Sequence, residues 1–161
     1  MSKAELLAQA LDEFLAVSEE VEAAAVVSAD GLPMASALPP YVEEDRLAAM
    51  SAALLTLGER AAVGLGKGDL AQVFVEGAHG HVVLMAAGPD AVLVAVTAKQ
   101  AKVGLVLFEM RKIAVKIAGV MEQGRPEPAP APMHEPAPMH EQPPAPMDVP
   151  PAPQPESVSS W

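Results

Sequence analysis

The sequence predicts an α+β sandwich in which helices pack against one five-stranded antiparallel sheet. Two observations predict this fold. Runs with helical and with strand-like apolar periodicity follow one another in the order helix, strand, strand, helix, strand, strand, strand, helix. The links between consecutive strand-like runs are short, which favours antiparallel neighbours.

The first helix is expected over residues 3–19. Ser2 and Glu5 have the S-x-x-E spacing of a capping box. Leucine and phenylalanine then recur at the i, i+4 and i+7 positions, which place side chains on one face of a helix. This run should form an amphipathic helix.

A tight hairpin should follow, with strands over 23–28 and 33–38. Gly31, in the turn between them, can adopt the positive φ angle that a short hairpin needs. Pro33 begins the second strand and has no N–H to donate, so that strand should lie at an edge of the sheet. The first strand is apolar on both faces and is expected near the centre.

The second helix, expected over residues 43–64, is apolar or small nearly all round. The sequence EED supplies negative charge to its first turn, as the helix dipole prefers. One apolar stripe consists of Leu47, Met50, Leu54, Leu57 and Ala61. Small and apolar residues occupy the other sides as well. A helix of this kind is buried on more than one side, so we expect the sheet to cover one side and a second chain another.

Three strands, over 70–76, 81–87 and 91–97, and a final helix over 99–121 complete the domain. The run 91–97 is apolar on both faces and is expected at the centre of the sheet. The run 70–76 alternates between apolar and mixed residues, which suits a less covered position.

The folded domain is expected to span residues 1–122, and residues 123–161 to form a disordered tail. Of the 17 prolines, 13 follow Gly124, and the sequence APMHE occurs twice there. Such a segment cannot bury enough apolar surface to offset the entropy of ordering it.

Composition argues against several classes of protein. The chain has 161 residues, a net charge of −11 and no cysteine. The charge disfavours nucleic acid or an anionic membrane as the main partner. No signal peptide and no long apolar run are evident, so we expect a cytoplasmic protein that does not span a membrane.

No stretch builds a convincing active site. Residues 64–69, GLGKGD, lack the spacing of a phosphate loop and follow a helix, so a helix end and loop is expected. His79 and His81 flank a hairpin with no third metal ligand evident, and His134 and His140 are too far apart in an extended tail to share an ion. We expect no catalytic residue, no metal and no cofactor.

The hairpin resembles a motif of the roadblock family of dynein-light-chain-like domains, V-x-S-x-D-G-x-x-[ILMV]-A-S. The matching residues are Val26, Ser28, Asp30, Gly31, Met34, Ala35 and Ser36. The element order and the small-residue second helix extend the resemblance over about residues 4–121. Within the family the chain is similar to the bacterial MglB-like branch, whose members are partners of MglA, a Ras-like small GTPase of cell polarity and motility systems.

The resemblance implies a homodimer in which the second helices of two protomers pair and the strands around 70–76 extend the sheet across both chains. The residues implied at this dimer interface are Met50, Leu54, Leu55, Leu57, Val73 and Val75. The hairpin would then serve as scaffold beneath the dimer helix.

The resemblance also implies a GTPase-activating regulator, in which two protomers contact one MglA-like GTPase and reposition the switch residues of that GTPase. The expected partner-binding strip consists of Arg46, Ala49, Ala53, Thr56 and Arg60. Its small, flat shape suits docking better than insertion of an arginine into a nucleotide site. A solvated face remains the alternative for Arg46 and Arg60, and a scaffold or adaptor subunit without GTPase-activating activity remains the alternative function.

Overall fold

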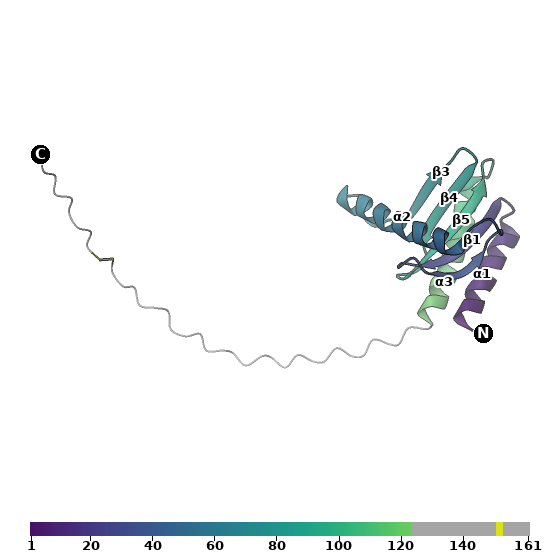
Figure 1. Ribbon diagram of the computed structural model, residues 1–161, viewed down its shortest axis with the longest axis horizontal. Coiled ribbons are helices and arrows are strands. Elements are labelled where there is room, and N and C mark those ends of the chain that lie inside the picture. The colour runs from purple at the N-terminus through teal and green to yellow at the C-terminus, as the bar shows by residue number, and fades with distance from the viewer. Residues whose placement is uncertain (124–150, 153–161) are drawn as a thin grey trace, which may run out of the picture. The chain divides into compact units, whose positions relative to one another are not determined.

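The computed structural model describes residues 1–123 and 151–152, and its elements follow the order expected from the sequence (Figure 1). The helices are α1 (Lys3–Val17), α2 (Glu44–Gly64) and α3 (Val103–Glu122). The strands are β1 (Val21–Ser28), β2 (Pro33–Ala37), β3 (Gln72–Glu76), β4 (Gly80–Ala86) and β5 (Ala91–Ala98).

The five strands form one sheet in the order β2-β1-β5-β4-β3, and every neighbouring pair is antiparallel. The predicted central positions of β1 and β5 are confirmed, as are the edge position of β2 and the less covered position of β3. All five residues of β2 and all five of β3 are at least partly exposed. Each edge strand has a free row of backbone groups within the described chain.

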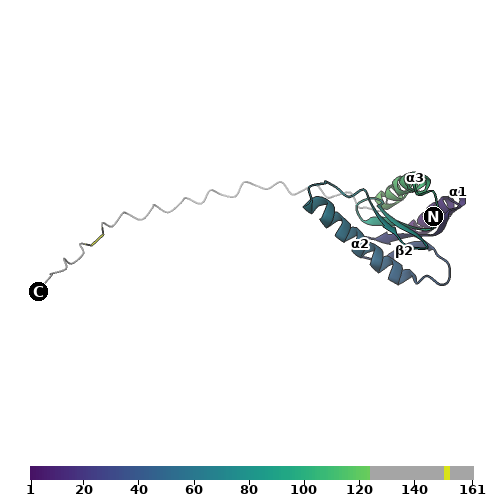
Figure 2. The same ribbon diagram turned by 90° about the horizontal axis from the view of Figure 1, so that it is seen from above.

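The helices divide between the two faces of the sheet. α1 and α3 cover one face, and α2 crosses the other (Figure 2). The larger core lies under α1 and α3 and is built around Phe14, Leu93 and Met110. The smaller core lies under α2, where Leu47 and Leu55 pack on valines and alanines of β1 and β5. Alternation of side chains along each strand supplies both cores.

Two helix ends differ from the expected ones. α1 ends at Val17 because Ser18 acts as its C-cap and donates its N–H to the Phe14 carbonyl. α3 begins at Val103 rather than near residue 99. A turn closed by the Ala101 N–H and the Ala98 carbonyl occupies the start of that run. The capping box of Ser2 and Glu5 is confirmed.

The predicted disorder of the tail and the reading of His134 and His140 fall outside the described residues. Both remain predictions from the sequence.

Candidate protein-interaction surface

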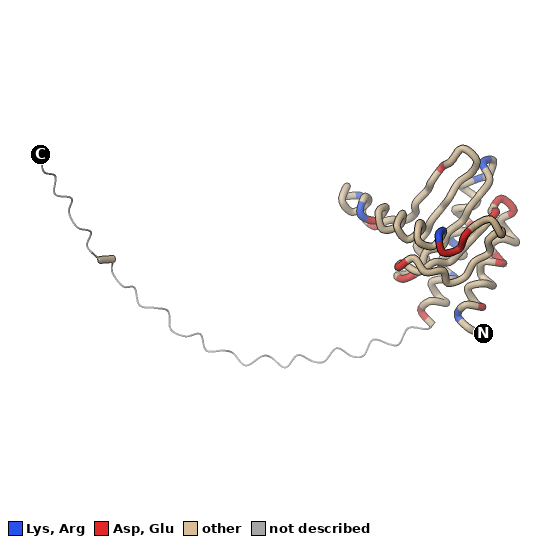
Figure 3. Tube along the Cα trace, viewed as in Figure 1, with Lys and Arg blue, Asp and Glu red and all other residues tan. Residues whose placement is uncertain are grey.

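α2 presents three different sides, of which only one faces the sheet. Its buried residues are Leu47, Ala48, Ser51, Ala52 and Leu55. By length and composition alone the helix is long and apolar enough to cross a membrane. It has charged residues at both ends and none from Leu47 to Gly58, as Figure 3 illustrates. Its buried side packs on the sheet through Leu47, Ala48 and Leu55.

The second side, which we call the apolar side, consists of Met50, Leu54 and Leu57. These side chains are 48%, 37% and 66% exposed. Their spacing of three and four residues places them on one stripe beside the buried side. The protomer therefore exposes to solvent a row of large apolar side chains that its own sheet does not cover.

β3 lies next to α2 and contributes to the same surface. Gly58 makes this approach possible, because a Cβ atom there would lie 2.9 Å from a methyl carbon of Val73. Val73 is partly buried against the core under α2, whereas Val75 is more than one third exposed. The helical pattern around position 58 does not explain a glycine there, because the explanation is this contact with a strand residue 15 positions later.

Leu55 differs from the other residues predicted at the dimer interface. It is only 7% exposed and belongs to the core under α2. Its side chain therefore stabilises the fold of the protomer. The sequence could not separate Leu55 from Leu54, because both belong to an uninterrupted apolar run.

The third side, which we call the small-residue strip, consists of Arg46, Ala49, Ala53, Thr56 and Arg60. All five residues are exposed. An open groove of about 470 Å³ is lined by Ala49, Ala53, Thr56 and Arg60 of this strip, and also by the buried Ala52 and by Leu57 of the apolar side. Arg46 lies apart from this groove, beside the acidic residues that begin the helix. Neither arginine forms an ion pair within residues 1–123.

The β1–β2 turn closes one end of the groove. Asp30 lines it, and Gly31, with φ +85°, lies against α2 at Ala49 and Ala52. In the sequence, Asp30 is identified only as a residue of the hairpin motif. Its position beside the small-residue strip depends on how the hairpin packs on α2, and a local sequence pattern does not predict that packing.

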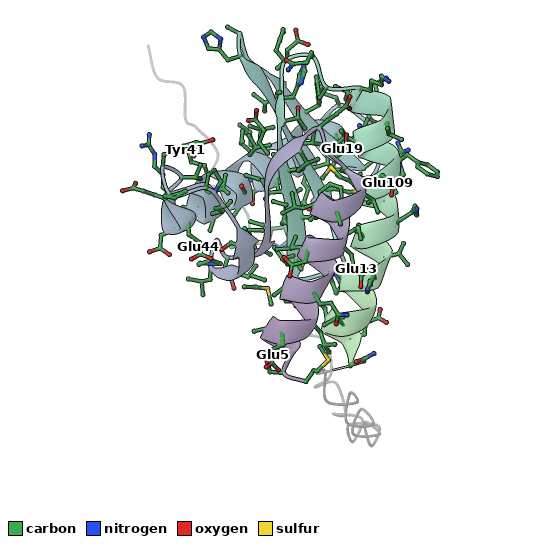
Figure 4. All side chains as sticks on the ribbon, turned by 90° about the vertical axis from the view of Figure 1, so that its right-hand side faces the viewer. Glu5, Glu13, Glu19, Tyr41, Glu44 and Glu109 are labelled. Carbon is green, nitrogen blue, oxygen red and sulfur yellow. The ribbon has the colours of Figure 1, made fainter. Side chains whose placement is uncertain are left out.

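The first turn of α2 is acidic, as expected, and carries Glu44 and Asp45 without a side-chain cap. Glu44 is hydrogen-bonded to the sheet: the Ser36 hydroxyl of β2 donates to its carboxylate at 2.5 Å. Tyr41 and Glu44 lie close to this end of the helix in Figure 4. The hydrogen bond fixes the start of α2 relative to the edge strand.

A polar cluster at one end of the sheet contains His81, one of the two histidines that flank the β3–β4 hairpin. His81 is buried, contacts the Thr97 hydroxyl through Nδ1 at 3.1 Å and stacks on Phe74. Lys99 donates to Glu76 at 3.0 Å, and this hydrogen bond and charge lower the pKa of the Glu76 carboxyl. His79 is exposed in the loop. Within the described residues, no three histidine or acidic side chains are grouped to hold a metal ion.

The stretch 64–69 ends α2, as predicted. Leu65 is the C-cap, and Gly66 and Gly68 have positive φ angles of 68° and 82°. The loop follows a helix C-terminus, where the dipole disfavours an anion.

Comparison with known proteins agrees with this geometry. The Roadblock/LC7 domain model matches residues 7–97. Two uncharacterized proteins of Methanocaldococcus jannaschii, MJ1340 and MJ0310, are each 36% identical over 100 residues, which span 62% of this chain and 87% of the relative. Myxococcus xanthus MglB superposes with a TM-score of 0.73 at 18% identity, covering 80% of this chain and 97% of that one. The gliding protein MglB of Thermus thermophilus gives 0.68 at 20% identity, covering 76% and 93%. At these identities the two superpositions establish a shared fold.

Proposed function

The chain belongs to the Roadblock/LC7 domain family, and from this membership and the three-sided helix α2 we propose that it is a homodimeric regulator of a Ras-like small GTPase of the MglA type. The observation that carries the proposal is the pair of exposed sides on α2, which carry no charge between Leu47 and Gly58. One is large and apolar, and the other is small and flat. A protomer with two such sides on one helix has room for two different protein contacts.

The apolar side supports the homodimer. Met50, Leu54 and Leu57 repeat on one stripe, and a twofold axis would pair that stripe with its own copy. Removing such side chains from water stabilises an interface by about 25 cal/mol per Å² of apolar area before the costs of association. Val75 on β3 lies on the same face of the sheet and would extend the contact to the edge strand.

The small-residue strip supports the GTPase contact. In a dimer paired through the apolar side, the two copies of the strip lie near the twofold axis. We therefore propose that one GTPase sits across both protomers. Ala53 and Thr56 have short side chains, so a partner backbone could approach α2 closely. Arg46 and Arg60 would dock acidic groups on that partner.

Stimulation of GTP hydrolysis would then come from repositioning the catalytic residues of the GTPase itself. An arginine inserted in trans has to reach a nucleotide site in another protein. Arg60 lies at the end of an open groove on the surface of a helix, a place suited to a docking contact. On this proposal the chain supplies no catalytic residue.

The direct test measures GTP hydrolysis by an MglA-type GTPase with and without the full-length protein. We expect stimulation by wild type and none by Thr56→Arg, whose bulk would fill the groove. Thr56→Arg should sediment as wild type does, which shows that the dimer survives. Equal stimulation by the two proteins would remove the small-residue strip from the proposal.

A scaffold without GTPase-activating activity is the second candidate. It is favoured by one observation: no described residue holds Arg46 or Arg60 in a fixed orientation through an ion pair. Binding of the GTPase in a pull-down without any change in its hydrolysis rate would select the scaffold over the activator.

A further inference from the structure

A second groove lies on the opposite face of the sheet from α2, between α3 and the edge of the sheet formed by β3 and β4. It has a volume of about 410 Å³ and is open along one side. Gln72 of β3, Met85 of β4, and Arg111 and Val115 of α3 are among its lining residues. α1 covers the sheet on the other side of α3, as Figure 4 shows. No helix of the described chain covers the groove.

The lining is mostly apolar. Met85 and Ala114 belong to the core beneath α1 and α3 and form part of the buried floor. Val115, on the rim, is 75% exposed. Phe74 continues the same face of β3 two residues beyond Gln72 and is more than one third exposed. The groove thus offers a strip of apolar contact beside an extended strand.

The charge of the groove is opposite to that of the protein. The chain has 21 acidic residues and a net charge of −11, yet no acidic side chain is among the groove-lining residues of the described chain. Arg111 is the one charged residue there. It forms no ion pair within residues 1–123, whereas its neighbours Lys112 and Lys116 are paired with Glu109 and Glu13.

We propose that this groove binds a peptide segment of a partner protein that carries apolar side chains beside a carboxylate. The apolar side chains would pack on Met85 and Val115. The carboxylate would accept hydrogen bonds from the Arg111 guanidinium, whose two-pronged geometry matches a carboxylate. The groove is open rather than enclosed, so it admits a continuing chain, which favours a peptide over a small molecule.

This inference goes beyond the proposed function and does not depend on it. The groove and the small-residue strip lie on opposite faces of the sheet, so both can be occupied at once. A variant that abolishes the GTPase contact, such as Thr56→Arg, should leave peptide binding unchanged. Failure of either proposal can therefore be recognised separately.

The probe is a library of random peptides displayed on phage and selected on the full-length protein, followed by synthesis of one enriched peptide. We expect enriched sequences to combine leucine, valine or phenylalanine with aspartate or glutamate. Amide resonances of Gln72, Ala86 and Gly88 should shift when the synthetic peptide is added to ¹⁵N-labelled protein.

Substitution then tests the charge argument. Arg111→Glu should weaken the peptide by more than about tenfold, because it replaces a charge-assisted hydrogen bond with repulsion. Val115→Asp should weaken it as well. Lys67→Glu makes the same change of charge at an exposed residue of the α2–β3 loop that does not line the groove, and should leave the affinity within about twofold.

Four results would overturn the proposal. They are the enrichment of basic peptides, the absence of any enriched peptide, equal effects of Arg111→Glu and Lys67→Glu, and shifts confined to residues of α2. Decanoate serves as a small anionic probe. If it shifted the same resonances while no peptide did, the groove would be a small-molecule site.

Discussion

Gly31 lies against Ala49: a Cβ atom added at position 31 would stand 3.4 Å from the Ala49 Cα and 3.5 Å from the Ala52 Cβ. The turn of the β1–β2 hairpin is thus braced on α2. The fold of the protomer itself explains the small residues at positions 49 and 52, because larger side chains there would push the hairpin away from α2. Ala53 and Thr56 do not contact position 31 in this way and stay free to meet a partner.

Gly31→Ala should destabilise the protomer by about 1–2 kcal/mol. Gly31 has φ +85°, a conformation that costs energy for a residue with a Cβ atom. Chemical denaturation measures the change. Gly64→Ala is the matched control, because position 64 is helical, has a normal φ angle and leaves a Cβ in open space. It should be neutral or stabilising by up to about 1 kcal/mol. Equal effects of the two substitutions would contradict this account.

Leu57→Glu and Leu55→Glu should separate assembly from folding. Leu57 is exposed on the apolar side and Leu55 is buried in the core. Leu57→Glu should yield a folded monomer, since only the proposed dimer contact loses apolar area. Leu55→Glu should cost the protomer several kcal/mol, because a carboxylate would enter the core. Sedimentation and thermal unfolding measure the two effects. A wild-type monomer at micromolar concentration would refute the dimer.

Arg60→Ala should lower GTPase stimulation by about tenfold, equivalent to about 1.4 kcal/mol. The reason is that a docking contact contributes to affinity more than to the chemical step. The assay uses saturating protein as well as low protein, because the loss should shrink at saturation. A fall of about 10³-fold that persists at saturation would instead identify Arg60 as an inserted catalytic arginine.

Glu76 should titrate below its ordinary pKa of 4.5, since Lys99 hydrogen-bonds its carboxylate and adds a favourable charge. A lowered folded-state pKa contributes stability above the unfolded pKa, and this contribution is lost as the pH falls through the folded-state value. Carboxyl carbon NMR measures the titration. In Lys99→Met the pKa of Glu76 should return toward 4.5. An unchanged titration in that variant would show that another group sets the shift.

Removal of residues 125–161 should change the melting temperature of the domain by less than about 5 °C, which corresponds to roughly 1 kcal/mol for a domain of this size. The expectation rests on the composition of this segment, which is too poor in large apolar residues to form a core. A larger drop, measured by calorimetry, would mean that the segment stabilises residues 1–122.

The order of elements and the sheet centre were predictable because they depend on local periodicity and turn residues. Pro33 alone indicates an edge strand, and the apolar run of β5 alone indicates a central one. The start of α3 was not predictable. Its Lys102 N–H is hydrogen-bonded at 2.6 Å by the carboxylate of Glu20, and a residue 82 positions away leaves no trace in the pattern around residue 102.

The candidate surface was predictable in composition and less so in arrangement. The all-round apolar character of α2 predicts that more than one side is covered. The structure shows one side buried on the sheet, and cover of another side by a second chain stays a prediction. Which leucine faces which side depends on the rotation of the helix over the sheet. That rotation is set by contacts such as Gly58 with Val73 and Gly31 with Ala49, which join residues from different elements.

The uncharged run of α2 from Leu47 to Gly58 has a consequence for how this protein tolerates mutation. On an ordinary surface helix, the exposed positions accept almost any polar residue. Here the buried side, the apolar side and the small-residue strip together take up the whole circumference. In a library of all single substitutions, aspartate and lysine should therefore be depleted at exposed positions such as Met50 and Ala53 almost as strongly as at the buried Ala48. The exposed face of α1 should accept them freely.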